Sequence, residues 1–412
     1  MKASIDTLQE WVLPSGAVVQ EIGWLDPLSC FSSYADTPHA LWFDSADTAH
    51  PAGGTSYIAI DPFEVLTIKN GNLNGLSVDP FDHLKARLAH FNEHWDGLPD
   101  DLPIFRGGAG GYFGYDLAQG LETLPPPVSP YALDDTGLAD MIVGLYDIVI
   151  AFDHKAHKCF LFSSGFPCTD VALRSHRAHS RLENIKQEIH GIGTTPPLES
   201  DDIPPAARKP TSPLSAEEYQ NRVQKVIDYI HAGDIFQANL SHRFTAELNA
   251  SDSAFAFYKR LRRISAAPFA AFFQLGDWAL TSASPERFLS CHKGKVETRP
   301  IKGTRLRHPL PELDAAFAKE LQNNEKERAE NIMIVDLLRN DIARVCTRGS
   351  INVPSLCAVE SFPSVHHLVS IIEGKLKPNA EPTDLLKACF PGGSISGAPK
   401  IRAMEIIAEL EN

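Results

Sequence analysis

The 412-residue sequence predicts an α+β fold. In its first half, short runs rich in β-branched and aromatic residues, which is the composition of strands, are separated by helical patterns. In its second half, two pairs of such runs flank Gly276–Asp277 and Lys293–Gly294, which is typical of hairpins. Hydrophobic residues make up 43% of the chain, which is enough for a sizeable core.

The first half contains four predicted strands and two predicted helices. The strands are expected at Tyr57–Ile60, Val65–Ile68, Met141–Phe152 and Lys158–Phe162, and the helices at Phe81–His94 and Thr169–His190. A glycine-dense stretch, RGGAGGYFGYD, runs from Arg106 to Asp116. Phe113 stands where a dinucleotide-binding loop needs its third glycine, so this stretch predicts strands that pack closely and not a nucleotide site.

A change in composition divides the chain. Residues 191–214 are rich in Pro, Ser, Thr and charged residues, and we interpret them as a surface linker. The predicted organisation is an N-terminal region, 1–190, and a C-terminal domain, 215–412.

The C-terminal half opens with a well-marked helix. Ser215 and Glu218 have the spacing of a capping box, and Gly233 is a natural stop. A strand is predicted at Ile235–Leu248, with Gln237 on its polar face, which we interpret as the wall of a cleft.

Further elements follow from the same patterns. The two hairpins pair Ala270–Leu275 with Trp278–Ala283 and Arg287–Cys291 with Lys295–Thr298; helices are expected at Leu313–Asn323 and Lys326–Val345, strands at Leu356–Val359 and His366–Ile372, and a last helix after Gly397.

Charge and cysteine usage exclude several classes of protein. The formal net charge of −14 argues against a nucleic-acid or membrane-surface partner, since no basic field covers the molecule. The seven cysteines never form C-x-x-C, which favours free thiols in a reducing cytoplasm over disulfides or a zinc site. We find no signal peptide and no run long enough to span a bilayer, so we expect a cytoplasmic protein.

Four segments of the C-terminal half concentrate residues suited to chemistry. They are SPERF from Ser284, RPIKGTRLR from Arg299, KERAENIMIVDLLRND from Lys326 and PGGSISGAPK from Pro391. Taken singly, Glu286, Lys302 and Glu330 are ordinary surface residues. The glycine loop is not a phosphate-binding Walker loop, because Ala398 stands where that motif needs lysine.

Together with HLVS at His367–Ser370, these segments resemble, in order and spacing, the chorismate-utilising enzymes. This family includes anthranilate synthases, aminodeoxychorismate synthases and isochorismate or salicylate synthases. The resemblance covers residues 215–412 and extends to SYADTPHALWFDS and GGAGGYFGYD in the first half. It implies the fold of anthranilate synthase component I: an α/β sandwich of two large, mainly antiparallel sheets surrounded by helices, with the active site in a cleft.

Two positions discriminate within the family. By resemblance, Gln237 stands where isochorismate and salicylate synthases have a lysine that activates water. Lys302 stands where anthranilate synthases have an alanine. The chain therefore resembles the aminodeoxychorismate synthases. That resemblance implies a transaminase-type transferase that converts chorismate and ammonia to 4-amino-4-deoxychorismate, for 4-aminobenzoate and folate. It also implies a separate glutamine amidotransferase that supplies the ammonia. The alternatives are anthranilate synthase component I and a non-catalytic protein that binds chorismate or a partner.

The resemblance implies three catalytic residues. Glu286 is the expected general acid for the departing C4 hydroxyl, which needs a raised pKa, and His367 is expected beside that hydroxyl. Lys302 is the expected nucleophile at C2, and it must attack as the neutral amine although a free lysine has a pKa of about 10.4. The neighbouring cations expected to favour that neutral form are Arg299, Arg305 and Arg307.

The resemblance also implies substrate and metal contacts. Glu330 is an expected ligand of Mg²⁺, which would bind a substrate carboxylate. The expected substrate-binding residues are Thr304, Gln237, Gly392, Gly393, Ser394, Gly397 and Lys400, with the glycine-loop amides acting at a helix N-terminus. The family continues past the position of Asn412 with a substrate-binding arginine and further Mg²⁺-binding glutamates. We therefore expect the activity of the complete protein and not of these 412 residues alone.

Overall fold

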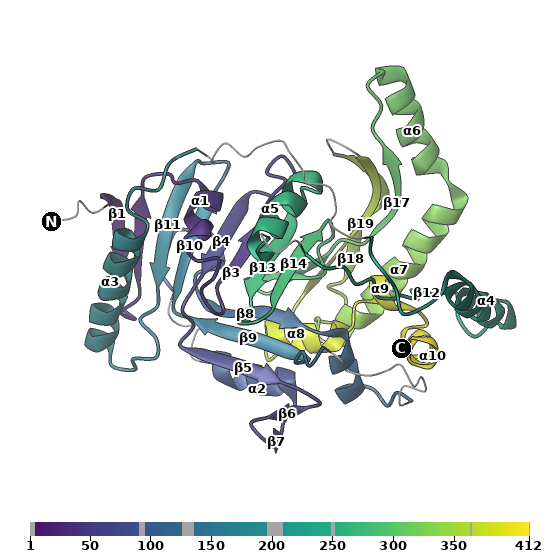
Figure 1. Ribbon diagram of the computed structural model, residues 1–412, viewed down its shortest axis with the longest axis horizontal. Coiled ribbons are helices and arrows are strands. Elements are labelled where there is room, and N and C mark those ends of the chain that lie inside the picture. The colour runs from purple at the N-terminus through teal and green to yellow at the C-terminus, as the bar shows by residue number, and fades with distance from the viewer. Residues whose placement is uncertain are drawn as a thin grey trace.

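The computed structural model describes residues 5–89, 95–125, 136–195, 209–248, 252–362 and 365–411. Every strand pairing in these ranges is antiparallel, and the two largest sheets have eight and five strands. Helices lie around the sheets (Figure 1). The predicted α+β class with two large antiparallel sheets is therefore confirmed. In the described ranges, no helix combines the length and apolarity that a membrane crossing requires.

The eight-stranded sheet is built by both halves of the chain. Its order is β1-β2-β11-β10-β4-β3-β13-β14. The bounds are β1 Thr7–Val12, β2 Val18–Ile22, β3 Leu41–Asp44, β4 Thr55–Ala59, β10 Ile148–Asp153, β11 Lys158–Ser163, β13 Phe269–Gln274 and β14 Ala279–Ser284. Strands β3 and β13 pair across the predicted linker, of which residues 196–208 lie outside the described ranges. The sequence division at 191–214 thus separates two stretches that share one sheet.

Three helices cover one face of this sheet. They are α1 Pro27–Ser32, α3 Val171–Glu188 and α5 Ala254–Ile264. Phe31 of α1, Leu182 of α3 and Tyr258 of α5 belong to one apolar cluster with Trp42 of β3, and all four are fully or almost fully buried. The apolar residues of the opposite face form a second cluster, so the strands are buried on both sides.

One predicted strand of the first half is wrong. Met141–Phe152 was expected as one strand, but it forms β9 Met141–Tyr146 and β10, which belong to different sheets. Between them the fully buried Asp147 accepts a hydrogen bond from Arg181 at 3.0 Å. A buried carboxylate needs such a partner, and the chain changes sheets there. The break is hidden in the sequence because both strands are buried on both faces and read as one apolar run.

The glycine-dense stretch forms a strand that packs closely on its neighbour, as predicted. β9 is the central strand of a three-stranded sheet, flanked by β5 Glu64–Ile68 and β8 Gly108–Phe113. A Cβ at Gly111 of β8 would lie 2.1 Å from the Ile142 carbonyl oxygen of β9, which only glycine avoids.

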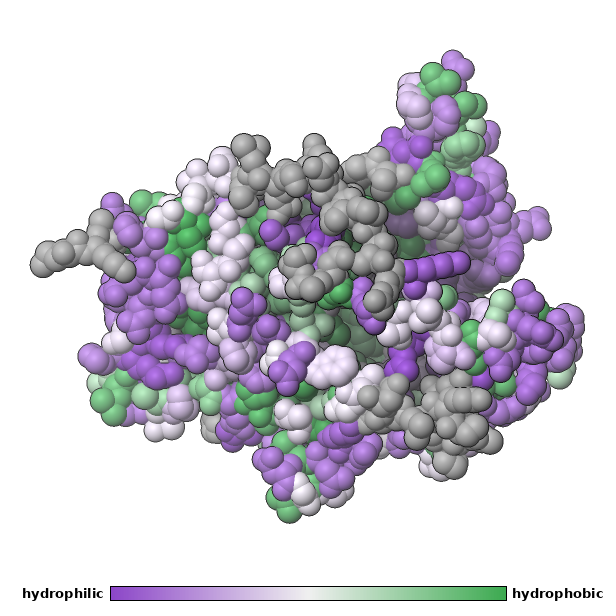
Figure 2. Space-filling view, in the orientation of Figure 1, coloured by the Kyte–Doolittle hydropathy of each residue, from purple (hydrophilic) through white to green (hydrophobic). Residues whose placement is uncertain are grey.

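The second large sheet lies in the C-terminal half. Its order is β15-β16-β19-β17, and β18 also pairs with β19. The bounds are β15 Ser290–His292, β16 Lys295–Thr298, β17 Ile301–Leu306, β18 Asn352–Ser361 and β19 Val365–Lys375, with α6 Pro311–Asn323 and α7 Glu325–Ala343 beside them. Both predicted hairpins, both predicted helices and both predicted late strands are confirmed to within a few residues. Strand β18 is longer than predicted, and β15 is shorter. The ends of β17 and α6 project from the body (Figure 1). Figure 2 shows apolar side chains among polar ones on this arm, where Leu306, Leu310, Leu313 and Phe317 are exposed.

The remaining elements are short or peripheral. They are β6 Asn72–Leu73, β7 Leu76–Ser77, α2 Pro80–Leu88, the 3₁₀ helix η1 Tyr115–Gly120, α4 Ala216–Ala232, β12 Gln237–Ala238, α8 Pro382–Cys389, α9 Gly393–Ser396, β20 Gly397–Ala398 and α10 Lys400–Leu410. Helix α2 ends earlier than the predicted 81–94, and residues 90–94 lie outside the described ranges.

The capping box of α4 is confirmed, and the strand predicted after it is wrong. Ser215 and Glu218 bond reciprocally, and Gly233 adopts a left-handed conformation. The predicted strand Ile235–Leu248 reduces to β12, which pairs with β20. Phe236 and Phe244 are 73% and 62% exposed. A strand needs a neighbour along its whole length to satisfy its backbone groups, and within the described ranges β20 supplies only two residues.

The buried carboxylate of Asp44 also joins the two halves, so we expect its removal to lower stability. Asp44 of β3 accepts hydrogen bonds from Tyr258 at 3.0 Å and Arg262 Nε at 2.7 Å, both on α5. We expect Asp44→Ala to lower the free energy of unfolding by about 3 kcal/mol, because it leaves the guanidinium and the phenol without their acceptor. Denaturant unfolding measures the change. Asp36→Ala, at an exposed position, is the control and should stay within about 0.5 kcal/mol; equal effects would contradict the assignment.

Candidate active site

Lys302 lies on β17, at an irregularity of its pairing with β19. Lys302 pairs with Leu368 and Thr304 with His367, so Gly303 is an extra residue, a β-bulge. Gly303 has φ +76°, and a Cβ there would lie 2.1 Å from Glu327 Oε2. Both the left-handed backbone and the close approach require glycine. The G in the segment PIKGT therefore sets the position of the lysine before it.

Glu286, from the loop after β14, lies beside Lys302. Its carboxylate Oε1 accepts a hydrogen bond from the Ile301 N–H at 3.3 Å. Burial raises the pKa of Glu286, while the Ile301 N–H, the Ser394 hydroxyl and the charge of Lys302 partly oppose that rise. A raised pKa is the property predicted for a general acid, because it keeps the carboxyl protonated at higher pH.

Ser394 of the glycine loop completes this cluster. Its carbonyl oxygen accepts from Lys302 Nζ at 3.4 Å and from Asn239 Nδ2 at 3.0 Å. Three segments predicted separately, SPERF, RPIKGTRLR and PGGSISGAPK, are thus brought together. Asn239 was not predicted as a site residue, although the polar alternation from Gln237 marks its position. Gln237 lies on β12, and its Oε1 is buried without a hydrogen-bond partner.

The glycines of the loop allow close packing. A Cβ at Gly393 would lie 2.3 Å from Leu337 Cδ2, and one at Gly397 would lie 2.2 Å from the Gln237 carbonyl oxygen. Gly397 belongs to β20, and the last helix begins only at Lys400. Gly392 precedes α9, which is a single turn. The loop thus contains the single turn α9 and closes on β12 before the last helix begins. The binding of a substrate carboxylate by its amides stays a prediction.

Lys400 lies apart from the cluster. Its ammonium is buried and pairs with Asp341 of α7 at 2.8 Å, and it also donates to the carbonyl oxygens of Cys389 and Pro391. The exposed fractions of the two side chains are 7% and 3%. Its charge is thus compensated within the protein, and it holds the start of the glycine loop. Its expected contact with a substrate stays a prediction.

Thr304 and His367 form a pair at the bulge. Thr304 Oγ1 and His367 Nδ1 are 3.0 Å apart. Burial lowers the pKa of His367, which favours the neutral imidazole near neutral pH. A neutral imidazole can accept or donate a hydrogen bond, as its predicted place beside a hydroxyl requires.

The arginines expected near Lys302 are already paired. Arg299 pairs with Glu360, and Arg307 with Asp314. Arg305 pairs with Glu320 and with Glu327. The expectation that these three cations favour a neutral Lys302 is therefore not supported, because neighbouring carboxylates balance their charges.

Glu330, the expected metal ligand, is half-buried on α7. Glu327, three residues earlier on the same helix, has a buried Oε2 without a hydrogen-bond partner. Residues three apart share a helix face. Within the described ranges no three His, Cys, Asp or Glu side chains are arranged to hold a metal ion.

Residues beneath the site form a polar network that the sequence did not reveal. Asn331 Nδ2 donates to the Leu368 carbonyl at 3.2 Å, and Asn331 Oδ1 accepts from the Ser370 hydroxyl. Ser370 Oγ in turn accepts from the Cys357 N–H at 2.9 Å. This network ties α7 to β18 and β19 behind Lys302. The segments AEN and HLVS contain three of its members, Asn331, Leu368 and Ser370, which belong to the family pattern described above.

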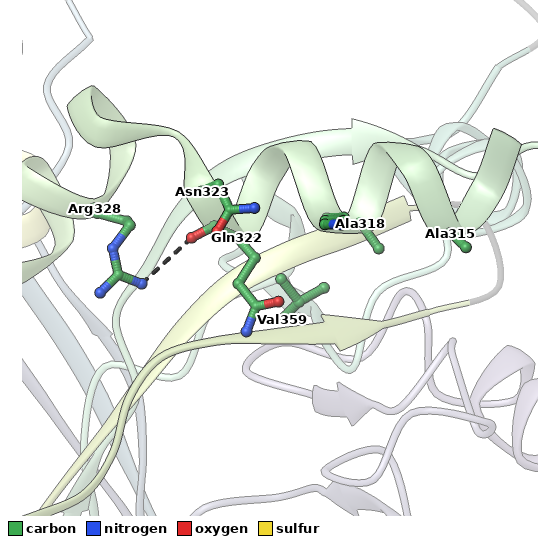
Figure 3. A pocket seen from close by; sticks show the side chains of 7 residues that line it. Ala315, Ala318, Gln322, Asn323, Arg328 and Val359 are labelled. Carbon is green, nitrogen blue, oxygen red and sulfur yellow. Dashed lines mark hydrogen bonds between the residues drawn. The ribbon is translucent and has the colours of Figure 1, made fainter.

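A groove elsewhere on the same sheet contains none of these residues. It has a volume of about 840 Å³ and lies between α6 and β18 (Figure 3). Its lining is Ala315, Ala318, Lys319, Gln322, Asn323, Arg328 and Val359. None of the residues predicted to act on a substrate lines it, so we place the candidate active site at the Glu286–Lys302–Ser394 cluster.

Comparison with known proteins bears on the family of the chain. A profile described as chorismate binding enzyme matches residues 38–412. Aminodeoxychorismate synthase component 1 of Klebsiella aerogenes is 40% identical over 389 residues, which cover 92% of this chain and 80% of that protein. Anthranilate synthase component 1 of Thermus thermophilus is 38% identical over 358 residues, which cover 86% and 74%.

The fold has a solved counterpart. Anthranilate synthase component I of Streptococcus pneumoniae superimposes with a TM-score of 0.70 at 34% sequence identity, covering 87% of this chain and 77% of that one. The match to one family profile extends over most of the chain, and the relatives are well above 30% identical. The chain therefore belongs to the family of chorismate binding enzymes.

Proposed function

We propose that this chain is the chorismate-aminating subunit of an aminodeoxychorismate synthase, a transaminase-type transferase that forms 4-amino-4-deoxychorismate. The observation that carries the proposal is Lys302, placed beside Glu286 and Ser394 in one cluster. Relatives named aminodeoxychorismate synthase component 1 support the same choice.

In the proposed first step, the Lys302 amine and the Glu286 carboxyl act on the substrate together. The Lys302 amine adds to C2 of chorismate, the ring double bonds shift, and the C4 hydroxyl leaves as water with the proton from Glu286. His367 and Thr304 lie at the bulge next to Lys302, where they would orient that hydroxyl. A general acid is required because hydroxide is a poor leaving group.

The proposed second step releases the lysine. Ammonia adds to C4, the double bonds shift back, and the Lys302 amine leaves C2, so the diene is restored with nitrogen at C4. The relatives are named component 1, which supports a second subunit in this protein too. We propose that it is a glutamine amidotransferase that supplies the ammonia, and that the product serves 4-aminobenzoate and folate synthesis.

We propose Mg²⁺ as the cofactor, held by Glu330. The residues fit a hard cation, because Glu330 is a half-buried carboxylate and Glu327 on the same face has an oxygen without a hydrogen-bond partner. When bound, the ion would neutralise a substrate carboxylate, with water and substrate completing its coordination. Gln237, whose Oε1 is likewise unpartnered, is proposed as a contact of the substrate.

Replacing the lysine tests the proposal. In the complete protein, extended past Asn412, we expect Lys302→Ala to abolish the C4-amino product from chorismate and ammonium chloride, because no other amine of the cluster can attack C2. Chromatography of the products, with Mg²⁺ present, measures this. Lys295→Ala, which removes a 62% exposed lysine of β16, is the matched control and should keep the wild-type rate.

Other results would reassign the function. Anthranilate from the complete, unmodified protein would make it an anthranilate synthase, and an unchanged rate in Lys302→Ala would refute the role of Lys302 as nucleophile. Calorimetric binding of chorismate without any product would favour a non-catalytic binding protein.

The pH dependence tests the acid. Because burial raises the pKa of Glu286, the protonated form persists above the usual carboxyl range and is lost as the pH rises through the raised value. We therefore expect kcat to fall with rising pH on that limb of its profile. Glu286→Gln should lower kcat by about 10²-fold or more and remove the limb. An unchanged limb in this variant would assign the titration to another group.

A further inference from the structure

A short loop of the first half reaches the sheet that carries Lys302. Residues 45–54 connect β3 to β4, and hydrogen bonds within the loop hold His50. The Asp47 carboxylate accepts from the His50 N–H at 3.2 Å, and His50 Nδ1 accepts from the Ala52 N–H at 2.9 Å. A Cβ at Gly53 would lie 2.0 Å from the Asp47 carbonyl oxygen. Since Nδ1 is an acceptor, the neutral imidazole has its proton on Nε2.

The imidazole of His50 stacks on Phe362, just after β18. The ring centroids are 4.5 Å apart and the planes are 12° from parallel. Phe362 is 7% exposed, and its ring also contacts that of His367, with centroids 5.4 Å apart. Three rings thus form a continuous column from the loop to the imidazole that meets Thr304 Oγ1 at 3.0 Å.

The backbone around Phe362 is held by separate bonds. Its N–H donates to the Val365 carbonyl at 2.8 Å, and its carbonyl accepts from Arg307 Nη1 at 2.7 Å. The backbone therefore stays in place without His50, whereas the Phe362 ring is confined on one face by the stacked imidazole. Without that imidazole the Phe362 ring could rotate. The His367 ring would then lose a fixed contact on that side.

The surroundings of His50 favour the neutral, stacked form. Burial lowers the pKa of His50; the charges of Arg299 and Arg287 lower it further, and those of Asp47 and Glu360 oppose them. The two arginines lie on segments adjoining the candidate active site, so the loop closes against that site and not against a distant surface.

We propose that His50 is a positioning residue: by stacking on Phe362 it holds the His367 imidazole in the orientation that the reaction needs. The proposal rests on the function proposed above, because it gives His367 its role beside the C4 hydroxyl. His50 contacts no reacting atom in this arrangement, so its effect is on orientation. Small displacements of a catalytic group lower turnover strongly, by up to about 10²-fold for 1 Å.

Two substitutions separate stacking from other effects of the histidine. We expect His50→Ala to lower kcat about tenfold while KM for chorismate stays within about twofold. His50→Phe keeps a flat ring against Phe362 and should restore most of kcat. The control is His157→Asn, which removes another histidine stack, 4.2 Å from Trp24, at a position where φ is +55° and asparagine is tolerated. It should leave kcat unchanged.

A second readout does not depend on turnover. In an NMR titration of the full chain, with the His367 signal identified by His367→Gln, the His367 imidazole should titrate at higher pH in His50→Ala, because water reaches the exposed ring. If the complete wild-type protein forms no product, the proposed function fails while this shift still supports the contact. An unchanged His367 signal in His50→Ala, or equal losses of kcat in the alanine and phenylalanine variants, would overturn the positioning role.

Discussion

The candidate active site depends on one irregular pairing, that of β17 with β19 around Gly303. A regular antiparallel ladder starting from Lys302 and Leu368 would place Thr304 opposite His366, which is buried and bonded to Asp314 and Ser361. The extra residue shifts the register by one. Thr304 then meets His367, and the lysine, the threonine and the imidazole come within one short stretch of two strands.

The remaining groups are brought to that stretch by the glycine loop. Its Ser394 contacts both Glu286 and Lys302, which lie far from it in the sequence. The buried pair of Lys400 with Asp341 anchors the start of the loop. A buried ion pair of this kind adds little net stability compared with apolar packing, but removing one partner is costly. Lys400 therefore has a structural role in holding the loop.

The two halves of the sequence are not mechanically independent. They share the eight-stranded sheet through the pairing of β3 with β13, and Asp44 of β3 is bonded to α5. The loop that follows β3 extends this connection to Phe362 and His367. His50, which belongs to no motif of the C-terminal half, is thereby linked to the candidate site through the ring of Phe362.

Local patterns in the sequence determined the fold class, the capping box of α4, both hairpins, the long helices and the family, because each depends on residues close together in the chain or on a fixed order of segments. The same reading identified Lys302, Glu286, Thr304 and His367. It could not separate β9 from β10 or foresee that the predicted strand after Gly233 shortens to β12, because those outcomes depend on which neighbour satisfies the backbone and on the buried partners of Asp147. Only the tertiary structure decided that Lys400 pairs with Asp341 and that the arginines near Lys302 pair with carboxylates. It also decided that Asn239 and Asn331 support the cluster. Each of these is a contact between side chains distant in sequence, and spacing along the chain does not encode the distance between them in space.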